Sequence, residues 1–105
     1  MASIPRMTKL VDAQAMARRY PDTFEAPTDA ELLTIEPRGF VKVSRCGERF
    51  WCQVIGGGGK YVIAHIANAL VKDDNQDIND HRLFFRIELR HIYDVMPPMG
   101  NSTQH

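Results

Sequence analysis

A change of hydrophobic period near Pro37 constrains the fold of this chain more than any other feature. Before Pro37 the apolar residues recur at helical spacing, and from Gly39 onward they alternate with polar residues. A period near 3.6 is typical of amphipathic helices, and a period of two is typical of strands with one buried face. The sequence therefore predicts short N-terminal helices followed by strands.

Two helices are predicted in the N-terminal third. The first covers residues 12–20, where apolar side chains share one face and arginines can face water. Thr28 and Glu31 have the spacing of a capping box, in which each side chain satisfies a backbone N–H of the other residue. A second helical turn or two is expected there, with Leu32 and Leu33 on its buried side.

The rest of the chain is predicted to form short strands joined by tight turns, at 39–45, 49–54, 60–66, 83–89 and, as a brief strand, Ala69 to Val71. The alternation points one set of apolar side chains inward: Val41, Val43, Phe50, Cys52, Val54, Phe85 and Ile87. This order predicts an α+β domain with a small barrel or rolled sheet.

Composition narrows the range of partners and compartments. The chain has 105 residues, 44% of them hydrophobic, and its 13 basic and 13 acidic residues give no net charge. A dedicated duplex-DNA binder would carry a strong positive charge, although a local basic face is compatible with this balance. We expect one soluble cytoplasmic domain, because no segment approaches the roughly 18 apolar residues of a membrane span. Cys46 and Cys52 are expected to be reduced thiols.

The stretch WCQVIGGGGKYV, residues 51 to 62, raises the question of a phosphate-binding loop. A P-loop requires GxxxxGK followed by Ser or Thr, but Val54 stands at the first glycine position and Tyr61 follows Lys60. The glycines also run into a strand pattern and do not open a helix. We predict a β-hairpin at Gly56 to Gly59, with glycine supplying positive φ, and no effect of Lys60→Ala on nucleotide affinity.

The segment VKDDNQDIND resembles part of a calcium loop. Asp73, Asn75 and Asp77 match its first, third and fifth positions, but Ile78 replaces the required glycine and Phe84 replaces the bidentate glutamate. We predict a solvated surface loop without a metal site.

A thiol enzyme would need Cys52 beside His65 or His91. Cys52 shares its predicted face with Phe50 and Val54, which favours burial as a small hydrophobic residue. We therefore predict no catalytic residues, no cofactor and no enzymatic activity.

The outward face of the predicted sheet supplies the candidate binding residues. Arg49 and Trp51 face away from the core on one strand, and Phe84 and Arg86 do so on the last long strand. Exposed aromatic side chains beside arginines can anchor a protein partner or stack on bases. The alternative is that the N-terminal helices fold over this face and bury Trp51, because a small domain needs its large side chains in the core.

GERFWCQV, the glycine hairpin, IANALV and FRIELRHIYDV together resemble an uncharacterised group of small bacterial proteins. That group has a GERxWVxV strand and a closing RHIxDV turn, and some members lie on plasmids and other mobile elements. The resemblance implies an SH3-like β-barrel over residues 38–96, with one helical turn at Arg90-His91-Ile92 before a last strand at Tyr93 to Val95. The chain departs from the pattern at 79–82, where the group has a glycine-aspartate turn.

These observations predict a single domain: a helical segment at 8–36, a barrel of about five strands at 38–96 and a flexible tail at 97–105. The predicted function is non-enzymatic protein binding through Arg49, Trp51, Phe84 and Arg86. The alternatives are binding of single-stranded nucleic acid by the same face and, third, a thiol-dependent enzyme. No membrane partner is expected.

Overall fold

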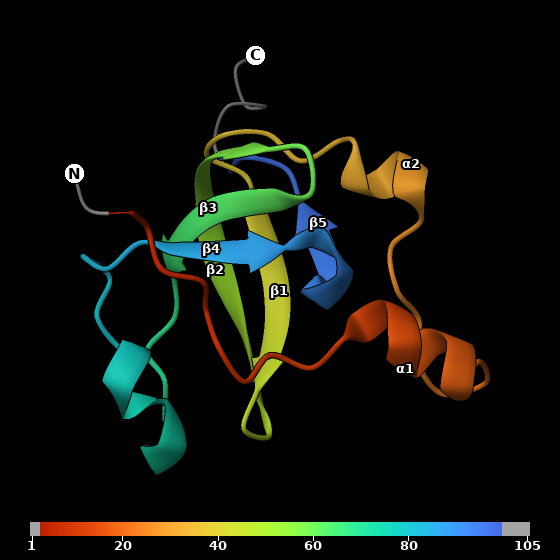
Figure 1. The fold of residues 1–105 in the computed structure, drawn as a ribbon, viewed down its shortest axis with the longest axis horizontal. Helices are drawn as coiled ribbons and strands as arrows, with labels where there is room; N and C mark the ends of the chain where they lie inside the picture. Colours follow the sequence, from red (N-terminus) through yellow and green to blue (C-terminus); the bar gives the residue numbers. More distant parts are fainter. Residues whose placement is uncertain (1–2, 100–105) are drawn as a thin grey trace.

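The computed structural model describes residues 3–99 and consists of one antiparallel sheet with short helices around it (Figure 1). Five strands lie side by side in the order β4-β3-β2-β1-β5. Their bounds, with those of the α-helices and 3-10 helices, are α1 Ala13–Arg19, α2 Asp29–Leu32, β1 Phe40–Arg45, β2 Glu48–Gly58, β3 Tyr61–Ile66, η1 Asp73–Ile78, β4 Phe85–Glu88, η2 Leu89–His91 and β5 Asp94–Met96. The predicted α+β class is confirmed.

Side-chain caps fix the start of both α-helices. Asp12 Oδ1 accepts a hydrogen bond from the Ala15 N–H at 2.9 Å, and Thr28 and Glu31 form the predicted capping box. The prediction that Leu33 is buried is wrong, because its side chain is 86% exposed. The α-helix ends at Leu32, so Leu32 packs against the core and Leu33 already belongs to the turn that leaves the helix.

The first hairpin joins β1 to β2 through a two-residue turn at Cys46 and Gly47. Both residues have positive φ, +52° and +82°, which is the backbone twist that a two-residue hairpin turn needs. The antiparallel register pairs Val43 with Phe50 and Arg45 with Glu48. This register places the alternating apolar residues of the two strands on one face.

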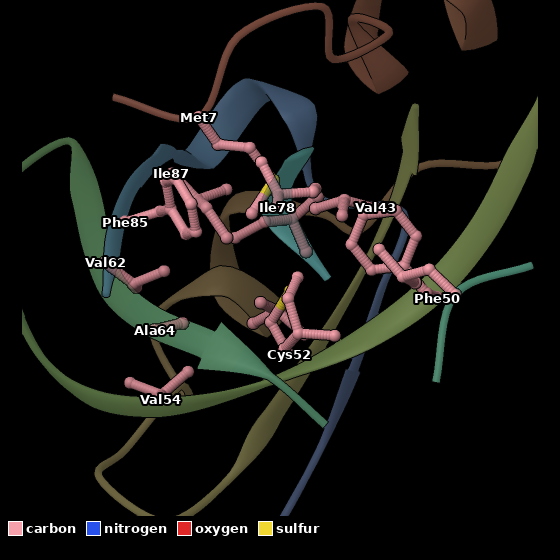
Figure 2. Close-up of a cluster of buried hydrophobic side chains, with 14 residues drawn as sticks. Met7, Val43, Phe50, Cys52, Val54, Val62, Ala64, Ile78, Phe85 and Ile87 are labelled. Atoms are coloured by element: carbon pink, nitrogen blue, oxygen red, sulfur yellow. The ribbon is translucent and has the colours of Figure 1, made fainter. Parts of the chain in front are cut away.

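Those apolar residues form the core, and Figure 2 shows their side chains converging on a common interior. All seven residues predicted to point inward are buried. Met7 from the N-terminal segment and Ile78 from η1 close the core on the side away from β2 and β3 (Figure 2). The core is thus built by the sheet and by segments outside it, which also contribute Leu70 and Ile92.

The N-terminal segment extends the hydrogen bonding of the sheet. Arg6 forms a parallel bridge with Arg86 of β4, and Leu10 forms an antiparallel bridge with Arg45 at the end of β1. The five strands do not close on one another. The segment between these two bridges runs from β4 to the end of β1 and is the red tube in Figure 1.

The β2–β3 hairpin is confirmed, but its predicted turn and the reason for its glycines are wrong. Gly58 pairs with Tyr61, so the turn is Gly59-Lys60 and the three glycines before it belong to β2. None of these four glycines has positive φ. Close approach explains Gly57, because a Cβ there would lie 2.7 Å from the Tyr61 carbonyl oxygen.

The connection between β3 and β4 differs from both predictions made for it. The predicted strand at Ala69 to Val71 does not form, because the backbone N–H groups of Leu70 and Val71 donate to the side chains of Asn79 and Glu48 instead of to a strand. Residues 73–78 form a 3-10 helix with Asn75 and Ile78 buried. This segment is therefore anchored to the protein, although most of its carboxylates are exposed.

The end of the chain follows the predicted order. One helical turn, η2, precedes β5, which pairs with β1. The loop at 79–82 is fixed by Arg82, which donates to Asp80 and holds the pKa of that carboxyl down at about 2. The predicted flexible tail lies outside the described residues from 100 onward, and Pro98 within it is buried. None of the helices in residues 3–99 is long and apolar enough to span a membrane.

Candidate functional site

The four predicted binding residues fall into two separate pairs. Arg49 and Trp51 lie on β2, whereas Arg86 lies on β4 and Phe84 immediately precedes that strand. β3 separates these two strands in the sheet, and the two pairs have different aromatic and cationic neighbours. The structure therefore does not bring the predicted residues together as one surface.

Arg49 lies between two aromatic rings. Its guanidinium carbon is 4.8 Å from the ring centroid of Tyr93 and 6.0 Å from that of Phe24. Tyr93 follows η2 and Phe24 lies in the connection between α1 and α2. Burial raises the pKa of Tyr93 above its ordinary value. Arg49 makes no ion pair within residues 3–99.

Trp51 is half-buried, which is intermediate between the two alternatives drawn from the sequence. Lys42 lies on the neighbouring strand β1, and its ammonium group is 5.0 Å from the centroid of the Trp51 ring. The backbone N–H of Trp51 donates to Asn68 Oδ1 at 2.6 Å. The N-terminal region lies next to Arg49, because the Phe24 ring centroid is 6.0 Å from the Arg49 guanidinium carbon.

A groove of about 860 Å³ lies beside Arg49 and separates the sheet from the connection between the two α-helices. Lys42, Arg49 and Tyr93 line its sheet side. The opposite side is formed by residues 21–23, 25–28 and Glu31. Four carboxylates line the groove as well: Asp22, Glu25, Glu31 and Asp94. We call this feature the Arg49 groove.

The second pair lies on the other side of β3. Phe84 is 43% exposed, and its ring meets His65 edge-on at 5.8 Å between centroids. The Arg86 guanidinium carbon is 5.6 Å from the centroid of Tyr61. The outward direction predicted for both residues agrees with their exposure, since Arg86 is half-buried and Phe84 exposed.

The sequence reasoning missed the most connected polar residue, Arg45, whose side chain is 1% exposed. Its guanidinium donates to the Thr8 carbonyl at 2.8 Å, to Asn75 Oδ1 at 3.0 Å and to both carboxylate oxygens of Asp77. Asn75 in turn donates to the Arg45 carbonyl and to Glu48. The sequence does contain a signal for this burial, because the period of two along β1 places Arg45 on the same inward face as Val41 and Val43.

The Cys52 thiol is poorly suited to nucleophilic chemistry. Cys52 is fully buried, as predicted, and burial raises the pKa of its thiol to about 12, which disfavours the nucleophilic thiolate. Cys46 lies in the first hairpin turn and is not bonded to Cys52. His91 has a buried Nδ1 without a hydrogen-bond partner, and burial lowers its pKa. Within residues 3–99 no three His, Cys, Asp or Glu side chains cluster as metal ligands would.

Comparisons of this chain with protein-family models, with curated proteins and with solved structures give no match.

Proposed function

We propose that this protein is a small non-enzymatic binding module that takes a segment of a protein partner in the Arg49 groove. The observation that carries the proposal is the pair of cations on the sheet side of the groove. Arg49 and Lys42 each lie against aromatic rings, and neither forms an ion pair within residues 3–99. Aromatic and arginine side chains at a groove are the residues that most often dominate binding energy.

The charges of the Arg49 groove favour a protein over a nucleic acid. Its four carboxylates outnumber the two cations, so a phosphate backbone along the groove would meet repulsion. A peptide can instead present both signs of charge, together with apolar side chains for Tyr93 and Pro27. Phe84 and Arg86 do not line the Arg49 groove and have no part in this proposal.

We also propose that the sheet is of the SH3-like barrel type and that the chain belongs with the bacterial mobile-element proteins it resembles. The strand order, the single helical turn before β5 and the pairing of β5 with β1 support the barrel assignment. Two thiols that are not bonded to each other are consistent with a role in a reducing cytoplasm.

The test is quantitative capture from a lysate of the native host, with identification of captured proteins by mass spectrometry. Wild-type protein, Arg49→Glu and a control, Arg18→Glu, are compared because both substitutions make the same charge change. Arg18 is exposed on α1. We expect a partner that the wild type and the control retain and that Arg49→Glu loses. Equal capture by all three proteins would contradict the proposal.

Single-stranded nucleic acid is the second candidate, favoured by the half-buried Trp51 with Lys42 over its ring. Fluorescence anisotropy of a labelled oligothymidine, measured between 50 and 200 mM salt, distinguishes it. Phosphate contacts would make affinity fall steeply over this range, whereas we expect no appreciable binding at either salt concentration.

A further inference from the structure

A second cavity lies at the turn of the β2–β3 hairpin, away from the Arg49 groove. Its volume is about 430 Å³, and Lys60, Tyr61, Arg86, Glu88, Leu89 and Arg90 line it. Three cations face one carboxylate there, although the whole chain carries no net charge. Such a concentration of positive charge favours an anionic ligand.

The cations of this cavity differ in whether they form ion pairs with carboxylates of the protein. Arg90 is held by Glu88 at 2.9 Å and by Asp12 at 3.8 Å. Arg86 and Lys60 make no ion pair within the described residues, and the Arg86 guanidinium lies over the Tyr61 ring. Two cations, of which Arg86 lies over an aromatic ring, are therefore available to carboxylates of a ligand.

An apolar groove of about 460 Å³ continues from this cavity and shares Tyr61 and Leu89 with it. Leu32, Leu33 and Ile35 form one wall, and the glycines of β2 form the other. Figure 1 shows the hairpin turn on the side of the sheet that faces α2. Exposed apolar side chains next to a basic cavity suit a ligand with both apolar and acidic groups.

The glycine wall is also a strand edge without a neighbour. β1 pairs with β2 up to Gln53, and the last bonds on that side join Val54 to Arg38 and Gly39. β2 continues to Gly58, paired only with β3. An unpaired edge is a template for an added strand, and Gly56 to Gly58 carry no side chains of their own.

We propose that the β2 edge at Gly56 to Gly58 binds an extended peptide segment of another protein, whose carboxylates reach Lys60 and Arg86. The peptide would add a strand to β2, and its alternate apolar side chains would pack on Leu33 and Ile35. The unpaired backbone favours a peptide over an anionic lipid, because an acyl chain offers no hydrogen bonds to a strand edge. This site is independent of the Arg49 groove.

The test selects binders from a phage-displayed library of random octapeptides and measures synthetic versions by fluorescence polarisation. We expect selected peptides to combine acidic residues with alternating apolar residues. Lys60→Glu should weaken them at least tenfold, since it reverses a charge in the cavity. Gly56→Val should do the same, because Gly56 lines the groove and a Cβ there meets nothing within 4 Å, so the added side chain should take space that the peptide needs.

Two further variants keep the test decisive. Arg18→Glu, on α1, makes the charge change of Lys60→Glu at a residue that lines neither the cavity nor the groove, and it should leave affinity unchanged. If Gly56→Val does not fold, Leu33→Asp takes its place in the test. The Leu33 side chain is 86% exposed and contributes little to the core, so this variant should fold. Arg49→Glu should also bind these peptides normally, which separates this site from the proposed function.

Several outcomes would overturn the proposal. These are a library without enriched peptides, enrichment of basic peptides, or affinity that neither Lys60→Glu nor the groove variant changes. Flotation with phosphatidylglycerol vesicles in the absence of peptide binding would assign the surface to a lipid. Concentration-dependent dimerisation by analytical ultracentrifugation, lost in Gly56→Val, would assign the edge to a second copy of this chain.

Discussion

The guanidinium of Arg45 donates to both carboxylate oxygens of Asp77, at 2.9 and 3.1 Å, although Arg45 is buried and the Asp77 side chain is 59% exposed. The same guanidinium bonds the Thr8 carbonyl and Asn75 Oδ1. One buried cation thus joins β1, the N-terminal segment and η1.

Replacing Arg45 should destabilise the protein more than replacing any exposed arginine. Arg45→Met leaves the buried Asn75 Oδ1 and the Thr8 carbonyl without their donor, and we expect the free energy of unfolding to fall by about 2 to 4 kcal/mol. Urea denaturation measures this. Arg82→Met is the matched control, because Arg82 pairs with Asp80 at the surface and surface pairs contribute little. Equal losses in the two variants would contradict this role for Arg45.

The hydrogen-bonded side chains around Arg45 also predict a loss of stability in acid. Hydrogen bonds from Asn75 and from the Val71 N–H hold the pKa of Glu48 below its ordinary value, and Arg45 lowers the pKa of Asp77. A carboxyl whose pKa is lower in the folded state than in the unfolded chain stabilises the fold at a pH above its unfolded pKa, about 4.3 for Glu48 and about 3.9 for Asp77. This stabilisation is lost as the pH falls through the pKa of the folded state.

Urea midpoints at pH 6.5 and pH 3.0 check this expectation. The Glu48→Gln/Asp77→Asn double variant should begin less stable and lose less between the two pH values than the wild type. Asp73→Asn, an exposed carboxyl of the same 3-10 helix, should behave as the wild type does. An unchanged pH dependence in the double variant would show that these carboxyls do not carry the effect.

The two thiols should react at very different rates. Cys52 is 0% exposed and its pKa is raised to about 12, whereas Cys46 lies half-buried in a hairpin turn. With Ellman's reagent in native buffer we expect Cys46 to react first and Cys52 only at the rate of unfolding. In denaturant both should react. Rapid native labelling of Cys52 in the Cys46→Ser variant would contradict the burial of its thiol.

Two neighbouring glycines should respond differently to alanine. A Cβ at Gly57 would approach the Tyr61 carbonyl oxygen at 2.7 Å, whereas a Cβ at Gly56 meets nothing within 4 Å. We expect Gly57→Ala to cost about 1 to 3 kcal/mol through displacement of the hairpin backbone, and Gly56→Ala to cost little. Thermal unfolding of the two variants gives the comparison. Similar melting temperatures would show that close approach does not explain Gly57.

The sequence was informative where a residue's environment depends on its neighbours along the chain. The capping box of Thr28 and Glu31 and the inward alternation of Val41 to Val54 were predicted correctly for this reason. Arg45 was missed because its partners Asp77 and Thr8 are distant in sequence, so nothing local offsets the cost of burying a charge. The expected strand at 69–71 failed because side chains, not a strand, satisfy its backbone.

The candidate site was predicted in part for a related reason. Alternation correctly assigned Trp51 and Arg86 to the outward side of their strands. Alternation does not reveal how strands are ordered, and β3 between β2 and β4 separates the two residues. The Arg49 groove also requires residues 21–28 and Tyr93, which only the tertiary fold brings to the sheet.

The affinity of the captured partner for Arg49→Ala, measured by isothermal titration calorimetry, tests the proposed protein-binding role most directly. Arg49 lies over Tyr93 at the groove, so its removal should weaken binding at least tenfold. Unfolding free energy should change by no more than about 1 kcal/mol, the value of an exposed cation–π contact. A partner that binds Arg49→Ala as tightly as the wild type would contradict the assignment of the Arg49 groove as the binding site.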